Sequence, residues 1–186
     1  MEFQSIRKVN EGKFITRYDL TYKTGEGNEK VYEIISRDRN IDSFEKVKNH
    51  PVDAVVLIMH DEAGEKVLLN KEYRMAVGNF VYNFPAGLID SGEEPLESAK
   101  RELWEETGLS LVRVDDMIRE SYSAVGFANE KDICVVGVAE GEFAPSTSDV
   151  EEIEAGWFTK AEVRELLKTE AFAARTQAYC YMWSKN

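Results

Sequence analysis

Three glutamates in the middle of the chain have the spacing of a metal site. Glu102, Glu105 and Glu106 stand at positions i, i+3 and i+4, which share one face of an α-helix. Carboxylates gathered on one face repel one another and destabilise an isolated helix. A divalent cation relieves this repulsion, and hard cations such as Mg²⁺ prefer carboxylate oxygens. The spacing therefore predicts a metal site, provided that these residues are helical.

The flanking residues predict a helix over residues 95–107. Pro95 suits the first turn of a helix, and Gly108 suits a left-handed cap at its end. Apolar residues also recur at helical spacing, and they would form the face that packs on the domain: Leu96, Ala99 and Leu103. The helix would thus present one apolar face and one acidic face.

The composition indicates a globular protein and argues against several classes of partner. The chain has 186 residues, enough for one domain with an extension, and its net charge of -12 disfavours nonspecific binding to nucleic acid. Its two cysteines have neither metal-ligand spacing nor the pattern of a disulfide framework. The sequence shows no signal peptide and no apolar run of membrane-spanning length. We therefore expect a cytoplasmic protein without a nucleic-acid or membrane partner.

Residues 1–48 are predicted to form an N-terminal antiparallel strand unit. Residues 13–23 alternate between apolar and polar side chains, 25–28 have turn composition, and 31–36 return as a second strand. The apolar side of the first strand would hold Phe14, Tyr18, Leu20 and Tyr22. Because two strands are marginally stable alone, this unit must pack either on the rest of its own chain or on a second copy.

Residues 49–186 are predicted to form a second domain of the α+β class, with helices packed on a mixed sheet. The near-continuous apolar run 52–59 indicates a central strand buried on both faces. Further strands are expected at 66–70, 79–84, 111–114, 117–123, 133–139 and 153–158. Thr159 and Glu162 match a capping box before a helix at 161–168, and a last helix is expected at 170–183. The polar segment 145–152 is expected to be a mobile loop.

The acidic helix is part of a longer pattern that resembles the signature of the Nudix hydrolases, GX5EX7REUXEEXGU, where U is a bulky aliphatic residue. The chain agrees at every fixed position of that signature: Gly87, Glu93, Arg101, Glu102, Leu103, Glu105, Glu106, Gly108 and Leu109. The resemblance implies the Nudix fold, an α/β/α sandwich. It also implies hydrolysis of a nucleoside diphosphate linked to another group, with Mg²⁺ or Mn²⁺ as the cofactor.

The resemblance assigns roles within this pattern, which we call the box (residues 87–109). Glu93 and Arg101 would form a pair that braces the loop against the helix, and Gly87 and Gly108 would give structural support. Glu105 and Glu106 would also carry catalysis. The implied metal ligands are the backbone carbonyl of Ala86 and the carboxylates of Glu102, Glu105 and Glu106.

The similarity to the ADP-ribose pyrophosphatase branch of the family extends beyond the box, to Tyr73-Arg74, 84–90 and 126–130. That branch forms homodimers that exchange their N-terminal strands, so the resemblance implies a homodimer here. It implies that Arg74 binds the phosphates of the substrate, because a guanidinium fits phosphate oxygens; a surface ion pair is the alternative. Arg37 or Arg39 would reach the substrate of the neighbouring subunit. Glu130 would be a further metal or water contact at the substrate, with an ordinary loop acid as the alternative.

The branch takes its general base from a glutamate on a mobile loop before the last strand, here residues 146–152. Glu151 aligns best and Glu152 next, with an ordinary solvated loop as the alternative. Tyr32 is a candidate for stacking on an adenine. The chain departs from the branch at Val125, where a proline is usual. Because valine lacks the fixed backbone angle of proline, this departure leaves the substrate open.

The resemblance therefore implies Mg²⁺-dependent hydrolysis of the pyrophosphate of an ADP-ribose-like nucleoside diphosphate sugar, giving AMP and a sugar phosphate. The same chemistry on another nucleotide sugar, a flavin dinucleotide or a dinucleoside polyphosphate is an alternative. A sensor that binds ADP-ribose without cleaving it is a third possibility. The complete box and the lack of a basic helix-turn-helix weigh against a sensor.

Overall fold

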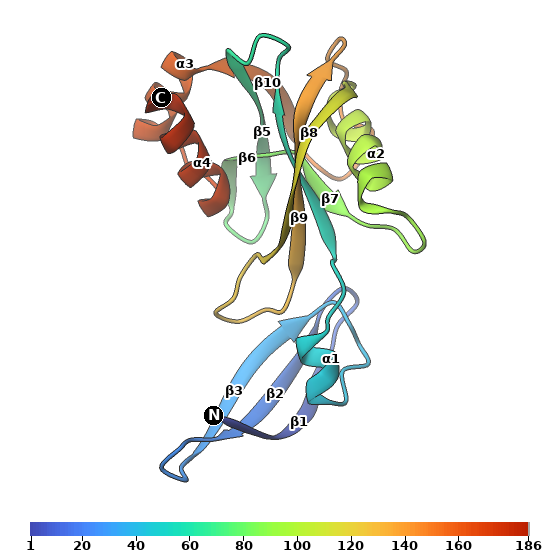
Figure 1. Cartoon of the computed structure of the whole chain (residues 1–186), viewed down its shortest axis with the longest axis vertical. Coiled ribbons are helices and arrows are strands. Elements are labelled where there is room, and N and C mark those ends of the chain that lie inside the picture. The colour runs from blue at the N-terminus through green and yellow to red at the C-terminus, as the bar shows by residue number, and fades with distance from the viewer. Residues whose placement is uncertain (186) are drawn as a thin grey trace. The chain divides into compact units, whose positions relative to one another are not determined.

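The computed structural model describes residues 1–185, which group into two compact units (Figure 1). Unit 1 comprises residues 1–53 and 120–132, and unit 2 comprises residues 54–119 together with the chain from residue 133 onward. A segment from the middle of the sequence thus belongs with the N-terminal residues. The division of the chain after residue 48 stays a prediction.

Unit 1 is built on a three-stranded antiparallel sheet in the order β1-β2-β3. Its elements are β1 (Glu2–Glu11), β2 (Thr16–Lys23), β3 (Glu29–Ser36) and the short helix α1 (Phe44–Lys48). The predicted antiparallel unit is therefore present, but it has three strands rather than two. The sequence does not predict β1, because most of its side chains are exposed and show no apolar alternation.

The core of unit 1 lies on one face of this sheet. Tyr18 and Leu20 of β2 are buried there together with Ile34 and Ile41. Phe14 was expected beside them, but it precedes β2 and is 69% exposed. The predicted alternation thus holds within β2 and ends at its first residue.

A seven-stranded sheet forms the centre of unit 2, in the order β10-β5-β4-β9-β8, with β6 paired to β5 and β7 paired to β4. The strands are β4 (Ala54–His60), β5 (Lys66–Arg74), β6 (Asn79–Asn83), β7 (Ala86–Leu88), β8 (Ser110–Tyr122), β9 (Lys131–Glu140) and β10 (Ile153–Thr159). The two strands expected within 111–123 are one continuous strand, β8. The short strand β7, which carries Gly87, was not predicted.

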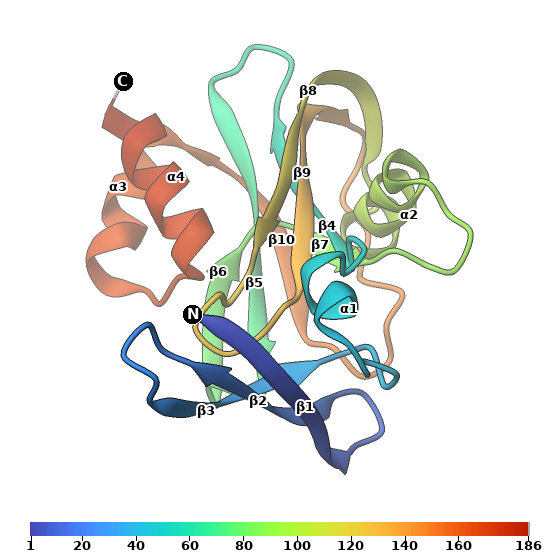
Figure 2. The ribbon, with the colours of Figure 1, turned by 60° about the horizontal axis from the view of Figure 1, so that its bottom comes forward.

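Helices cover both faces of this sheet (Figure 2), with α2 (Pro95–Thr107) on one face and α3 (Lys160–Thr169) and α4 (Ala174–Lys185) on the other. Alternation along β4 explains the two layers. Leu57 is buried in the cluster that includes Leu103 of α2, whereas Ile58 is buried in the cluster that includes Val163 of α3. The strand is thus buried on both faces as predicted. The α+β class and the α/β/α sandwich are confirmed.

The two C-terminal helices begin differently. The predicted capping box starts α3: the Thr159 N–H donates to Glu162 Oε2 over 2.8 Å, and the Glu162 N–H donates to Thr159 Oγ1 over 3.3 Å. The last helix starts four residues later than expected, at Ala174. The preceding backbone is instead paired with β6, through Tyr82 N–H to Ala171 O and Ala173 N–H to Tyr82 O. None of the helices in residues 1–185 is long and apolar enough to cross a membrane.

Candidate metal and active site

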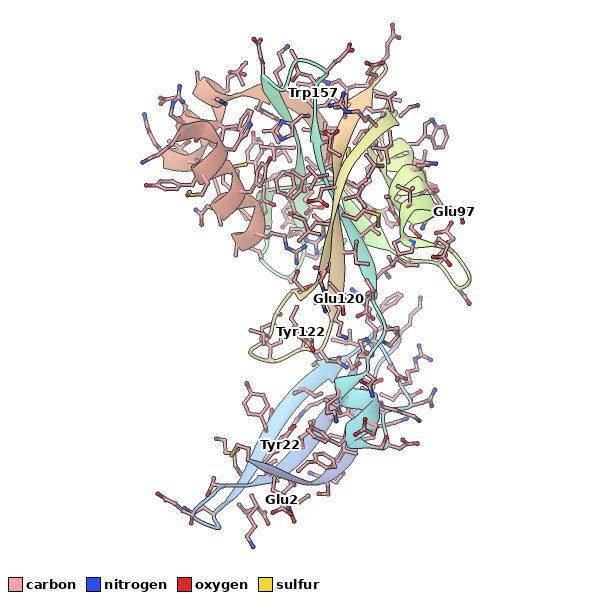
Figure 3. The ribbon with its side chains drawn as sticks, in the orientation of Figure 1. Glu2, Tyr22, Glu97, Glu120, Tyr122 and Trp157 are labelled. Carbon is pink, nitrogen blue, oxygen red and sulfur yellow. The ribbon has the colours of Figure 1, made fainter. Side chains whose placement is uncertain are left out.

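The box glutamates lie on α2, whose place in unit 2 is set by its apolar face. Ala99 and Leu103 are fully buried against the sheet. The helix has the predicted bounds, and Gly108 follows it with a φ of 79°, the left-handed cap. Glu97 lies on the opposite side, where it is exposed and points away from the sheet (Figure 3). One helix therefore carries both solvated and buried carboxylates.

Glu106 is the most deeply buried acid of the box, with 9% of its surface exposed. Its Oε2 accepts hydrogen bonds from Asn70 Nδ2 at 2.8 Å and from the Ala86 N–H at 3.3 Å. Burial raises the pKa of Glu106 well above its ordinary value, and the nearby charges of Glu102 and Glu72 raise it further. Asn70 Oδ1 is also buried, without a hydrogen-bond partner among the residues described. A cation here would favour the ionised carboxylate.

Glu102 fills the space that a side chain at Gly87 would occupy. A Cβ built on Gly87 would lie 2.0 Å from the carboxyl carbon of Glu102, far closer than atoms can approach. Glycine is therefore required on β7 for this carboxylate to rest against the backbone beside Ala86. Burial raises the pKa of Glu102, and the adjacent Arg101 opposes that shift.

Arg101 connects four carboxylate and carbonyl groups of the box. Its Nη2 donates to Glu93 Oε2 at 2.9 Å and to the carbonyl of Leu88 at 3.0 Å. Its Nη1 donates to Glu102 Oε1 at 2.6 Å and to Glu105 Oε2 at 3.2 Å. Hydrogen bonds from Arg101, and next from Ser98, lower the pKa of Glu93 to about 2. Arg101 thus holds Glu93 and the loop after β7 with one edge and two predicted metal ligands with the other.

The donor atoms at the box fit a hard divalent cation. Glu102 and Glu106 are carboxylates whose ionised forms are disfavoured by burial, so a bound cation would compensate a real electrostatic penalty. Among residues 1–185, no three His, Cys, Asp or Glu side chains already stand in an arrangement for holding a metal ion. At the box, Arg101 Nη1 lies between Glu102 and Glu105. The ligand roles of Ala86, Glu102, Glu105 and Glu106 stay predictions.

One acid at this site was missed in the sequence. Glu72 lies on β5, 9% exposed, and alternates with Asn70 and Arg74, so the three side chains share the sheet face that α2 covers. Its Oε2 accepts from Arg74 Nη1 at 3.4 Å, and its Oε1 accepts from Asn83 Nδ2 at 3.1 Å. The period of two along residues 70–74 was the available signal. This period was overlooked because the charged residues of the stretch suggested an exposed strand edge.

The acidic loop before β10 lies against the box. The Thr147 N–H donates to the carbonyl of Glu105 over 2.9 Å, and the Tyr73 N–H donates to the carbonyl of Glu152 over 3.0 Å. The charge of Glu151 contributes to the raised pKa of Glu106, so their carboxylates are within electrostatic reach. Both candidates for the general base therefore lie on a loop that contacts the box, and Glu151 is within electrostatic reach of Glu106.

The remaining predicted residues belong to unit 1. Arg37 Nε donates to Glu130 Oε2 at 2.5 Å, so these two are brought together, while the Tyr32 hydroxyl donates to the carbonyl of Gly126. Arg39 donates to the carbonyl of Lys13 and lies 4.0 Å from Glu11 Oε1. Val125 is 79% exposed in the loop between β8 and β9. The substrate roles assigned to these side chains stay predictions.

Comparison with known proteins points to one family. A model of the NUDIX domain matches residues 50–180 of the chain. An ADP-ribose pyrophosphatase of Bacillus subtilis is 35% identical over 88 residues, which are 47% of this chain and 46% of that protein. An ADP-sugar pyrophosphatase of Mus musculus is 33% identical over 106 residues, 54% of this chain and 44% of that protein. The matches thus span about half the length of these relatives.

The fold has a counterpart among solved structures. The crystal structure of an ADP compounds hydrolase superposes with a TM-score of 0.75 at 20% sequence identity, covering 100% of this chain and 93% of the other. At that identity the likeness concerns the fold. It extends over unit 1 as well as over the region that the domain model matches.

Proposed function

The chain belongs to the Nudix family, and from this premise we propose that it hydrolyses the pyrophosphate of ADP-ribose or a closely related nucleoside diphosphate sugar, giving AMP and a sugar phosphate. The observation that carries the proposal is the complete box, with Glu106 buried behind Asn70 and Glu102 seated against Gly87. The relatives named for ADP-ribose and ADP-sugar cleavage support the substrate class.

Nudix hydrolases generally need a divalent metal, and we assign Mg²⁺, with Mn²⁺ as a substitute, to the carboxylates of Glu102, Glu105 and Glu106 and the carbonyl of Ala86. When bound, the metal would neutralise charge on the phosphate oxygens and lower the pKa of an attacking water. The contacts of Arg101 would allow a metal to take its place beside Glu102 and Glu105. Its Nε and Nη2 can keep their contacts with Glu93 while Nη1 releases Glu102 and Glu105.

Two further groups act on the substrate in this proposal. Glu151 takes the proton of the attacking water, because it lies on the loop that contacts the box and its charge reaches Glu106. Arg74 binds a phosphate of the substrate, because its side chain is 57% exposed and lies on the same face of β5 as Glu72 and as Asn70, which contacts Glu106. Glu106 and Arg74 thus lie at the two ends of one row of polar side chains, which runs from Glu106 through Asn70 and Glu72 to Arg74.

Gly87→Ala should damage activity much more than folding. The three atoms nearest to the added Cβ all belong to the carboxyl group of Glu102, the far end of a flexible side chain that can swing away at little cost in stability. The displaced carboxylate would then leave its place beside Ala86, and a misplacement of about 1 Å typically reduces rates by about 100-fold. Steady-state rates over a Mg²⁺ titration, with thermal unfolding in parallel, check this. Gly25→Ala is the matched control, because nothing lies within 4 Å of its added Cβ. Wild-type rates in Gly87→Ala would contradict the assignment of Glu102.

We also propose a homodimer in which the N-terminal strand unit, residues 1–48, is exchanged and the Nudix domain spans residues 49–186. In that assembly Arg37 or Arg39 would reach the substrate of the partner copy, Glu130 would contact the substrate or its metal, and Tyr32 would stack on the adenine. Sedimentation of the full chain tests the assembly directly. A particle with the mass of one chain, 21.2 kDa, at all concentrations would contradict it.

A second substrate within the same chemistry is a nucleotide sugar or dinucleotide other than ADP-ribose. Val125 favours keeping it open, because this exposed loop residue replaces the proline usual in the ADP-ribose branch. A panel of nucleoside diphosphate compounds with Mg²⁺ or Mn²⁺, read as released phosphate after phosphatase coupling, separates the candidates. We expect the highest kcat/KM on ADP-ribose. A higher value on another compound would replace the substrate, and no hydrolysis of any compound would favour a sensor.

A further inference from the structure

A relay of hydrogen bonds connects α4 to the end of β5. It begins at the backbone N–H of Phe84, which donates to Thr176 Oγ1 at 3.2 Å, and the Thr176 hydroxyl donates to Asn83 Oδ1 at 2.8 Å. Asn83 Nδ2 then donates to Glu72 Oε1 at 3.1 Å, and Glu72 Oε2 accepts from Arg74 Nη1 at 3.4 Å. Four side chains from three elements are thereby joined in one chain of contacts.

The direction of this relay is fixed by its donors and acceptors. The Glu72 carboxylate can only accept, so Asn83 turns Nδ2 toward it, and the Thr176 hydroxyl, which accepts from Phe84, donates to Asn83 Oδ1. A group at position 72 must therefore accept from Asn83 on one side and from Arg74 on the other. A carboxylate meets both requirements, whereas an amide meets only one.

Burial decides which group of this set is held in place. Thr176 is fully buried and the Glu72 side chain is only 12% exposed, whereas the Arg74 side chain is 57% exposed. Glu72 is thus anchored from the core, and Arg74 is the exposed partner. The negative charge of Glu72 by itself repels an anionic substrate, so its presence beside the proposed phosphate-binding arginine needs a compensating role.

We propose that Glu72 is a positioning residue that aims the Arg74 guanidinium at a phosphate of the substrate, with the Thr176–Asn83 pair holding Glu72 in turn. This inference rests on the proposed function, because it assumes that Arg74 binds the substrate. It assigns a role to an acid outside the box and links substrate affinity to a buried threonine of α4. Glu72 acts on binding, and the acids of the box act on cleavage.

Glu72→Gln is a selective test of this role. The amide keeps an acceptor for Asn83 because that side is buried and an unpaired donor there is costly, so its NH2 group faces the guanidinium of Arg74. We expect KM for ADP-ribose to rise about tenfold, the effect of losing one charged hydrogen bond at a partly exposed site, with kcat nearly unchanged. Calorimetric titration with ADP-ribose in Ca²⁺ should show the same change in Kd.

A double-mutant cycle with Arg74→Gln shows whether Glu72 acts through Arg74. In the Arg74→Gln background, Glu72→Gln should no longer raise KM and should lower it slightly, because only the repulsion between Glu72 and the substrate is then removed. Glu154→Gln is the control for net charge, since this exposed acid of β10 pairs with Lys71 and therefore lies on the sheet face opposite Arg74. It should leave KM unchanged in both backgrounds.

A second route reaches the same residue without changing any charge near the phosphates. Thr176→Val breaks the relay at its far end and should raise KM about threefold, a fraction of the effect of one lost hydrogen bond, whereas Thr176→Ser should not. This pair decides the question if Glu72→Gln fails to fold. Equal increases in Thr176→Val and Thr176→Ser would count against the relay.

The outcomes separate this inference from the proposed function. The role of Glu72 would be overturned if Glu72→Gln raised KM equally in the wild-type and Arg74→Gln backgrounds. It would also be overturned if Glu72→Gln lowered kcat at unchanged KM. Either result would leave the proposed hydrolase activity intact. If the wild type binds ADP-ribose without cleaving it, the proposed function fails, and the same cycle measured as Kd still tests Glu72. A wild type that does not bind ADP-ribose would remove both.

Discussion

Glu106→Gln is expected to lower kcat on ADP-ribose by about 10³-fold or more, because a metal-bound charge typically contributes several kcal/mol to such a transition state. Both hydrogen bonds to Glu106 end on Oε2, from Asn70 and from the Ala86 N–H. A glutamine can keep both with its carbonyl oxygen. The substitution therefore removes the charge and leaves the packing, and initial rates at saturating Mg²⁺ measure the consequence.

The same substitution should change how metal-free stability depends on pH. The folded-state pKa of Glu106 lies well above its ordinary value of 4.5, so the folded protein binds this proton more tightly than the unfolded chain. Stability from this group is therefore full below about pH 4.5 and declines as pH rises through the folded pKa. Thermal unfolding without metal should show this decline in the wild type and a smaller one in Glu106→Gln, while Mg²⁺ should stabilise the wild type more.

Glu97→Gln is the matched control for these effects. It removes one charge from the same helix, but Glu97 is exposed on the side away from the sheet (Figure 3). Its rate, metal response and unfolding should follow the wild type. A Glu106→Gln protein as active as Glu97→Gln would show that the box does not carry catalysis.

Glu151→Gln is expected to lower kcat by about 10²- to 10⁴-fold, the usual contribution of a general base. Glu152→Gln is its neighbour and control, and it should cost little, because Glu152 is held to Tyr73 through its backbone carbonyl, which the substitution keeps. The reverse order of the two rates would move the base to Glu152, and equal small losses would remove the base from this loop.

Local signals in the sequence were enough to predict the helix that carries the box glutamates. Pro95, Gly108 and the spacing of Ala99 and Leu103 predict α2 with the bounds that the structure shows. These signals act within one or two helical turns, so no knowledge of the fold is needed to read them. The capping box of α3 was readable for the same reason.

Elements that depend on distant partners were missed or misplaced. The strand β1 is mostly exposed and is defined by its pairing with β2, and residues 171–173 are extended because they pair with β6. Glu72 belongs with them: its burial follows from Asn83 and Arg74 around it rather than from its sequence neighbours alone. Pairing and burial of this kind arise only when the chain is folded.

Arg101 shows how far the sequence could be read at the site itself. The spacing of Glu102, Glu105 and Glu106 predicted repelling carboxylates on one face. The structure places a guanidinium between two of them, with Nη1 at 2.6 Å from Glu102 and 3.2 Å from Glu105. The i, i+4 spacing of Arg101 and Glu105 could have indicated this pairing. Without metal, Arg101 provides part of the positive charge that the three acids require.

The most direct test of the central claim is ³¹P NMR of ADP-ribose incubated with the wild-type protein and Mg²⁺. We expect the two pyrophosphate signals to be replaced by equal amounts of AMP and ribose 5-phosphate, with no conversion after chelation of the metal or in Glu106→Gln. ADP-ribose that remains intact with the wild type and Mg²⁺, or cleavage that continues at the same rate after chelation, would contradict metal-dependent hydrolysis by the box.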